Sequence, residues 1–304
     1  MVEEKMVRVR VPGTTANCGP GFDAIGIACN IYNELELTLK PEGELVITVA
    51  GEGAANIPGD SRNIVWRSVQ HLLRKARINC QGAHIKMQNN VPLSRGLGSS
   101  AAAIVAGLKA ANEAIGGRFN NDELLAMATE IEGHPDNVAP AIFGGVTISV
   151  VQEDGQPACL SFIPEIPLKL IVAVPEFSLS TRSARSVLPQ TVPFHDAVFN
   201  VSRASLLVAA LCRGETRLLR QAFDDALHQP YRAALIPGMY EVFKAARAAG
   251  ALGAALSGAG PCLIAFATKN ADQIGEAMTA AFAKEQVKSR YLVLNIDSQG
   301  AQVL

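Results

Sequence analysis

Alternating apolar and polar residues along several stretches of the chain predict β-strands. Residues 7–11 read Val-Arg-Val-Arg-Val, which indicates a strand with one buried face. Residues 32–39 and 44–49 alternate in the same way, and the turn Pro41-Glu42-Gly43 between them predicts a hairpin. Residues 11–26 are rich in turn-forming residues and predict a loop. Further strands are expected over residues 83–87, 146–152, 168–174 and 289–296, and on both sides of a glycine turn within 254–266.

Apolar residues that recur every three or four positions predict helices between these strands. The clearest helix spans 100–115, where Ser99 can cap the first turn and Gly116-Gly117 ends the last. A second helix spans 122–132, capped by Asn120 or Asn121 and ended by Gly133. The other predicted helices cover 63–76, 194–213, 216–227, 238–249 and 271–283, and 180–189 is a loop or a helix start.

Strands and helices are mixed in both halves, which predicts an α+β fold. The 304 residues are enough for two domains. The polar turn at 152–157 predicts a boundary near residue 154, with one domain over 1–154 and the other over 155–304.

Composition and charge exclude several classes of protein. A net charge of −1 and 5% aromatic residues argue against a nucleic-acid partner. Charges throughout the first eleven residues argue against a signal peptide, and the most apolar run, 205–212, is too short to span a membrane. Six scattered cysteines without a Cys-x-x-Cys pair indicate reduced thiols and a cytoplasmic protein. The five histidines have no metal-ligand spacing.

The segment Pro92–Ala102, PLSRGLGSSAA, has the composition of an anion site. Its glycines allow the backbone to approach a ligand closely, and the predicted helix that follows presents unpaired amides at its N-terminus. A nucleotide phosphate is the expected anion. No lysine follows the last glycine, so the segment is not a Walker A loop.

Two more glycine-rich loops, VPGTTANCGPGFDAIGIACN from Val11 and ALSGAGPCLIAF from Ala255, are each flanked by apolar patterns. The order and chemistry of the three loops resemble the GHMP kinase family, and the resemblance covers nearly the whole chain. The string TANCGPGFD, together with HPDNVAPAIFGG, SARSVLP and PYRAALIPG, resembles the homoserine kinase branch of that family. The resemblance implies an N-terminal domain like ribosomal protein S5 domain 2 and a ferredoxin-like C-terminal domain.

The resemblance also implies an ATP-dependent kinase that phosphorylates the side-chain hydroxyl of L-homoserine. ATP would contact the second loop, two residues of the third loop, and Asn63, which either contacts adenine or caps its helix. These ATP-binding positions are Asn63, Pro92, Leu93, Ser94, Arg95, Gly96, Leu97, Gly98, Ser99, Ser100, Ala101, Ala102, Ser257 and Gly258.

Magnesium needs hard oxygen ligands and keeps several waters, so the Ser100 hydroxyl and one carboxylate would suffice. The resemblance places that carboxylate on the helix over 122–132, at Glu130 or Glu132. These two lie about 200° apart around a helix, so only one of them can face the site. The sequence leaves the choice open, and both could instead be solvated helix charges.

L-Homoserine is a small zwitterion that needs a cation for its carboxylate and oxygen acceptors for its ammonium. The resemblance assigns Arg185 and Arg232 to the carboxylate, in keeping with the bidentate geometry of arginine. It places Asn17, Asp23, His134, Asp136 and Asn137 around the amino and hydroxyl groups, and it gives Asn137 and Thr181 catalytic positions beside the two glutamates.

A general base is left open: either Asp136 accepts the hydroxyl proton or no side chain does, since a loose transition state asks little of a base. Two alternatives to a homoserine kinase remain, another GHMP small-molecule kinase and a non-catalytic binder with the same fold. The resemblance further implies a possible homodimer and a place in threonine biosynthesis.

Overall fold

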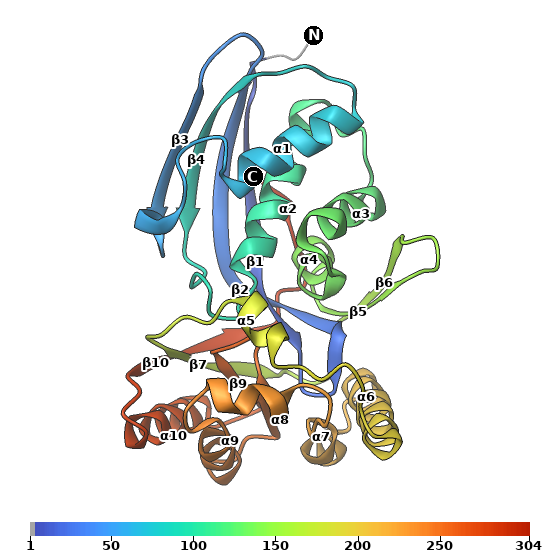
Figure 1. The fold of residues 1–304 in the computed structure, drawn as a ribbon, viewed down its shortest axis with the longest axis vertical. Helices are drawn as coiled ribbons and strands as arrows, with labels where there is room; N and C mark the ends of the chain where they lie inside the picture. The colour runs from blue at the N-terminus through green and yellow to red at the C-terminus, as the bar shows by residue number, and fades with distance from the viewer. Residues whose placement is uncertain (1–3) are drawn as a thin grey trace.

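The structure is a computed structural model that describes residues 4–304, and it contains two β-sheets with helices packed against them (Figure 1). The seven-stranded sheet has the order β11-β1-β2-β4-β3, and β5 and β6 extend it from one end of β2. Its strands are β1 (Met6–Asn17), β2 (Gly21–Lys40), β3 (Leu45–Gly51), β4 (Gly82–Asn89), β5 (Val146–Val151), β6 (Pro157–Phe162) and β11 (Gln302–Val303).

Four helices pack on one face of this sheet and enclose the first apolar core (Figure 1). They are α1 (Ile64–Lys75), α2 (Ser99–Ala114), α3 (Asn121–Glu132) and α4 (Pro135–Phe143), and a short 3-10 helix, η1 (Ala54–Asn56), precedes α1. Helix α2 lies at the centre of that core and is buried on nearly all sides. Most of its own residues are small, which allows the sheet and the other helices to approach it closely.

The second sheet has the order β10-β7-β9-β8, with β7 (Lys169–Pro175), β8 (Gly253–Leu256), β9 (Leu263–Ala267) and β10 (Ser289–Asn295). One face packs on α9 (Met239–Ala248) and α10 (Ala271–Lys284). The other face shares a core with the first sheet, α6 (Phe194–Arg213) and α7 (Thr216–Ala222). The short helices α5 (Thr181–Ser186), α8 (Gln229–Arg232) and η2 (Ala233–Leu235) complete this half, and α5 lies at the junction of the two sheets (Figure 1).

The predicted hairpin between residues 32–39 and 44–49 is wrong. Strand β2 pairs with β1 and β4, whereas β3 pairs in parallel with β4, Leu45 opposite Ala83. Helix α1 connects β3 to β4 as the crossover that a parallel pair requires. The alternation of each strand was recognisable, but its partner was set by packing of the whole sheet.

The loop predicted over residues 11–26 is instead the end of the β1–β2 hairpin, with a tight turn at residues 18–20. Gly26 lies in β2, where a Cβ would meet the carbonyl oxygen of Asp136 at 1.9 Å, so this glycine allows α4 to pack directly on the strand. The sequence analysis also missed β6 and α4, and the helix predicted over 216–227 ends at Ala222.

Other predicted elements agree with the structure. Helix α6 has the predicted bounds, and α3 begins with a capping box between Asn120 and Glu123 and ends at Gly133. The boundary after residue 154 stays a prediction. Because β6 still pairs with β5 in the first sheet, the strand pairing favours a boundary between Phe162 and Lys169.

Candidate active site

The three glycine-rich segments meet at the junction of the two sheets and hydrogen-bond to one another. Ser257 Oγ lies 2.6 Å from the carbonyl oxygen of Gly96 and 2.9 Å from Thr15 Oγ1. The Asn17 side chain donates to the carbonyl of Gly258 at 2.8 Å, and the Thr14 amide donates to the carbonyl of Leu97 at 3.0 Å. The loop before α2 is therefore held between the first strand and the second sheet.

Two glycines of this loop are required by the protein's own packing. Gly96 and Gly98 have φ angles of +80° and +65°, which side-chain-bearing residues rarely adopt. A Cβ on Gly96 would lie 2.1 Å from the Ser257 carbonyl oxygen, and one on Gly98 would lie 2.0 Å from Thr14 Oγ1. Gly98 is the N-cap of α2 and offers no side chain, so the predicted capping by Ser99 is wrong. The first amides of α2 have no intrahelical acceptor and remain able to bind an anion.

A cavity of about 240 Å³ opens at this N-terminus of α2. Its walls come from the glycine-rich loop before α2 (residues 92–98, the phosphate-loop candidate), the ends of β1 and β2, the α3–α4 connection, α5 and the third glycine-rich loop. It is lined by Asn17, Asp23, Leu93, Ser94, Arg95, Gly96, Gly98, Ser99, Ser100, Glu132, His134, Asp136, Asn137, Leu179, Ser180, Thr181, Arg185, Arg232, Gly258, Ala259 and Gly260.

Glu132 and Ser100 form a hydroxyl–carboxylate pair in this cavity, with Ser100 Oγ donating to Glu132 Oε2 at 3.0 Å. Burial raises the pKa of Glu132, against the opposing effects of His134 and the Ser100 hydrogen bond. Glu130 points to the other side of α3, where it lies 3.1 Å from Lys75 Nζ and 3.0 Å from His71 Nε2. Of the two glutamates that the sequence left open, only Glu132 lines the cavity.

The α3–α4 connection places three polar side chains in the same wall. His134 Nδ1 hydrogen-bonds to Asp136, which is only 2% exposed. Burial lowers the pKa of His134, but the hydrogen bond and charge of Asp136, together with Glu132, outweigh burial and raise it overall. Asn137 Oδ1 accepts a hydrogen bond from Thr14 Oγ1 at 2.9 Å, which ties α4 to the first strand.

Two arginines also line the cavity, and they differ in their hydrogen-bond partners. Arg185 forms two hydrogen bonds to the carboxylate of Asp23, at 2.8 and 2.9 Å. Arg232 is 1% exposed and donates to the carbonyl oxygens of Ala184 and Gly258 and to His228 Nδ1. No acidic side chain in residues 4–304 lies within 4 Å of the Arg232 guanidinium nitrogens. Burial and the nearby charge of Arg185 lower the pKa of Arg232 to about 10.

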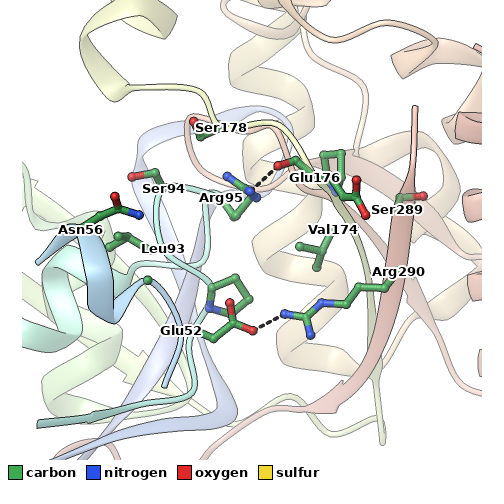
Figure 2. Close-up of a pocket in the computed structure, with 13 residues that line it drawn as sticks. Glu52, Asn56, Leu93, Ser94, Arg95, Val174, Glu176, Ser178, Ser289 and Arg290 are labelled. Atoms are coloured by element: carbon green, nitrogen blue, oxygen red, sulfur yellow. Dashed lines mark hydrogen bonds and ion pairs between the residues drawn. The ribbon is translucent and has the colours of Figure 1, made fainter. Parts of the chain in front are cut away.

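A larger cavity, of about 630 Å³, adjoins the first and shares Leu93, Ser94 and Arg95 with it. Figure 2 shows its walls, which come from the segment after β3, the loop before α2, the end of β7 and the start of β10. An ion pair between Glu52 and Arg290 joins the two halves of the molecule across it, and Arg95 donates to the carbonyl of Glu176 (Figure 2).

Comparison with known proteins decides the family. The model of the GHMP kinase N-terminal domain matches residues 63–145, and that of the GHMP kinase C-terminal domain matches residues 207–284. A homoserine kinase of Moorella thermoacetica is 46% identical over 98% of this chain and 100% of its own length. The chain belongs to the GHMP kinase family.

Further relatives within the family agree with this assignment. A homoserine kinase of Carboxydothermus hydrogenoformans is 44% identical over 97% of this chain and 96% of its own. The crystal structure of homoserine kinase from Cytophaga hutchinsonii matches all of this chain and 98% of its own with a TM-score of 0.90 and 33% identity. A mevalonate kinase of L. major, at 19% identity and a TM-score of 0.73 over 95% of each chain, shares the fold. The predicted two-domain GHMP kinase fold is confirmed.

Several predicted ATP-binding positions do not line either cavity. Asn63 is fully buried, and its side chain accepts from the amide of Val65, so it caps α1. Leu97, Ala101 and Ala102 are core residues because they lie on the inward side of the loop and helix, and Ser257 is buried in the contacts that hold the loops together. Pro92 lines the larger cavity, and the remaining loop positions line the smaller one.

Some cavity residues were missed by the sequence analysis. Glu52 and Ser178 are single polar residues in loops, Asn56 ends the short helix η1, and Arg290 belongs to an alternating strand. None of them carries a signal that separates it from an ordinary surface residue. Within residues 4–304, no three His, Cys, Asp or Glu side chains cluster as a metal site, and no helix there is long and apolar enough to cross a membrane.

Proposed function

We propose that the protein transfers the γ-phosphoryl group of ATP to the side-chain hydroxyl of L-homoserine. The observation that carries this proposal is Arg232, a buried cation without an acidic partner in residues 4–304, which faces a cavity at the N-terminus of α2. A buried charge without a counter-charge is costly, and a bound carboxylate would supply the missing partner. The homoserine kinase relatives support this choice of substrate.

The nucleotide occupies both cavities in this proposal. Its triphosphate lies against the amides of Ser99 and Ser100, where the helix terminus favours negative charge. Its nucleoside extends past Leu93 and Ser94 into the larger cavity, which those residues connect to the smaller one. This places the base near Asn56 rather than Asn63.

The Ser100–Glu132 pair fits a magnesium ion. One hydroxyl and one carboxylate, 3.0 Å apart beside the triphosphate site, provide the hard oxygen ligands that Mg²⁺ uses when phosphates and water complete its shell. When bound, the ion neutralises charge on the phosphate oxygens. Glu132 serves this role best when ionised, and its burial strengthens its attraction to a cation.

The substrate lies between the two walls of the smaller cavity. Arg232 and Arg185 contact its carboxylate, and Asp23 accepts from its ammonium. Asn17, His134, Asp136, Asn137 and Thr181 surround the amino and hydroxyl groups. The carboxylate of Asp136 is already hydrogen-bonded to His134, so we assign no general base. The hydroxyl proton of the substrate then leaves to phosphate or water.

The wider assignments are proposed on separate grounds. Six cysteines without a disulfide in residues 4–304 support a reducing, cytoplasmic setting. The homoserine kinase relatives support a place in threonine biosynthesis. Exposed Phe194, Val198 and Val201 follow one face of α6 and support a homodimer.

A coupled assay of ADP release tests the proposal. L-Homoserine should be phosphorylated with a kcat/KM well above that of mevalonate or shikimate, because those alcohols have no ammonium for Asp23. Preference for another alcohol would assign the protein to a different GHMP kinase activity. ATP binding without turnover of any alcohol would favour the non-catalytic binder.

A further inference from the structure

Asp23 and Arg185 are the two groups proposed to hold the opposite charges of the substrate, yet in the structure they bind each other. Nη1 of Arg185 donates to Oδ2 of Asp23, and Nη2 donates to Oδ1. The two side chains are 36% and 37% exposed, respectively, and line the cavity, so a ligand can reach both of them. The Asp23 amide donates to Asn17 Oδ1, which holds residue 23 at a φ of +55° and fixes its carboxylate in this position.

Arg185 also lies close to the second arginine of the site. The guanidinium groups of Arg185 and Arg232 lie 5.5 and 5.2 Å from the centre of the same Phe22 ring. Burial, and after it the charge of Arg185, lowers the pKa of Arg232, because two cations this close repel each other. An anion that reaches Arg232 therefore also attracts Arg185, away from Asp23.

We propose that the Asp23–Arg185 ion pair determines specificity by exchange of partners. The substrate carboxylate binds Arg185, and the substrate ammonium replaces Arg185 as the partner of Asp23. This inference rests on the proposed function. It adds that the protein holds an internal pair that competes with any ligand carrying only one of the two charges. A zwitterion leaves neither Asp23 nor Arg185 unpaired, because it supplies a partner to each.

Singly charged ligands meet this competition in different ways. A hydroxy acid without an amino group can attract Arg185 only by leaving the carboxylate of Asp23 without a cation. An amino alcohol without a carboxylate has to share Asp23 with Arg185. Removing one member of the pair should therefore help the ligand that competes with it. A site in which Asp23 and Arg185 act independently predicts no such gain.

The test uses two variants and two analogues of homoserine. Asp23→Asn keeps the shape of the side chain and tolerates the positive φ, and it should raise kcat/KM for 4-hydroxybutyrate by about two- to fivefold, the range expected for loss of a partly exposed ion pair. Arg185→Gln should raise kcat/KM for 3-aminopropan-1-ol to a similar extent. Each variant should lower kcat/KM for homoserine by about tenfold or more.

A matched control is the exposed pair of Asp224 with Arg247, which lies outside the site. Asp224→Asn should leave all three substrates unchanged, and an equal gain with 4-hydroxybutyrate in this variant would overturn the proposal. So would an unchanged or lower kcat/KM for the matching analogue in either folded site variant. Homoserine turnover by the wild type, measured alongside, separates these failures from failure of the proposed function.

Wild-type protein alone supplies a second measurement if either variant does not fold. Homoserine, 4-hydroxybutyrate, 3-aminopropan-1-ol and propan-1-ol form a cycle in which each charge is added alone or together. Exchange predicts that both charges together improve kcat/KM by more than the product of their separate effects. Equality with that product would overturn the proposal.

Discussion

Glu132 and Glu130 offer a direct test of the metal assignment because they lie two residues apart on α3 and face opposite ways. Glu132→Gln removes one negative charge and keeps an oxygen that can accept from Ser100. A charge-assisted contact contributes about 1.5–3 kcal/mol, and each 1.4 kcal/mol corresponds to about tenfold. We therefore expect the Mg²⁺ concentration for half-maximal activity to rise by about 10- to 100-fold. Glu130→Gln should leave it unchanged.

Stability should change in the opposite direction from activity. Because burial raises the pKa of Glu132, the stability contributed by its protonated form is present at low pH and is lost as pH rises through that pKa. At neutral pH the ionised carboxylate therefore opposes folding, and Glu132→Gln should raise the melting temperature of the ligand-free protein. Glu130→Gln loses only its partly exposed contacts to Lys75 and His71, worth about 1 kcal/mol or less, and should lower the melting temperature slightly.

Titration of activity with Mg²⁺, together with thermal denaturation, measures both effects. Equal shifts in Mg²⁺ dependence for the two variants would refute the assignment of Glu132. A fall in both melting temperature and activity of Glu132→Gln would instead identify the glutamate as a structural residue.

Three further outcomes follow from the site. Arg232→Lys should raise the KM for homoserine by about tenfold or more and leave the KM for ATP unchanged, because lysine keeps the charge but loses the bidentate geometry of the guanidinium. A rise in the KM for ATP would instead place Arg232 on the phosphates. Because the pKa of His134 is raised, its protonated form contributes stability that is present below the ordinary histidine pKa and is lost as pH rises through the raised pKa. Asp136→Asn should reduce this pH dependence of stability, which histidine NMR and unfolding at several pH values would measure. Gly98→Ala should destabilise the fold by about 1–3 kcal/mol more than Gly116→Ala, as measured by denaturant unfolding. Both glycines have a positive φ, but only at Gly98 would an added Cβ have a neighbour within 4 Å.

Sequence reasoning located the phosphate-loop candidate because its motif is contiguous, and a glycine turn before a helix has the same local structure in many folds. The glycine at position 98 was expected to allow a ligand to approach the backbone, and the structure gives a different reason for it. Gly98 accommodates Thr14 of the first strand, whose Oγ1 would lie 2.0 Å from a Cβ at position 98, and this contact between distant segments leaves no local signal. The wrong β2–β3 pairing has the same cause, because strand partners depend on the whole sheet.

Which of the two glutamates lines the cavity could have been inferred from the sequence. Leu125, Ala128 and Glu132 follow one another at spacings of three and four, so Glu132 continues the apolar face of α3, while Glu130 falls on the opposite side. A carboxylate on an apolar helix face is the exception that indicates a site. By contrast, Asp23 and Arg185 are 162 residues apart, and no sequence pattern predicts that they pair.

The charges of this cavity fall into two groups that differ in how folding satisfies them. Asp23 and Arg185 satisfy each other and remain partly exposed, so they can exchange partners. Arg232 is buried and Glu132 is partly buried, and in each case the loss of solvent shifts the pKa toward the neutral form. Folding alone would favour apolar residues at both positions, since a buried charge opposes it. A cation and an anion kept in one cavity against this penalty fit the proposed function, in which a substrate carboxylate and a metal–phosphate complex bring the opposite charges.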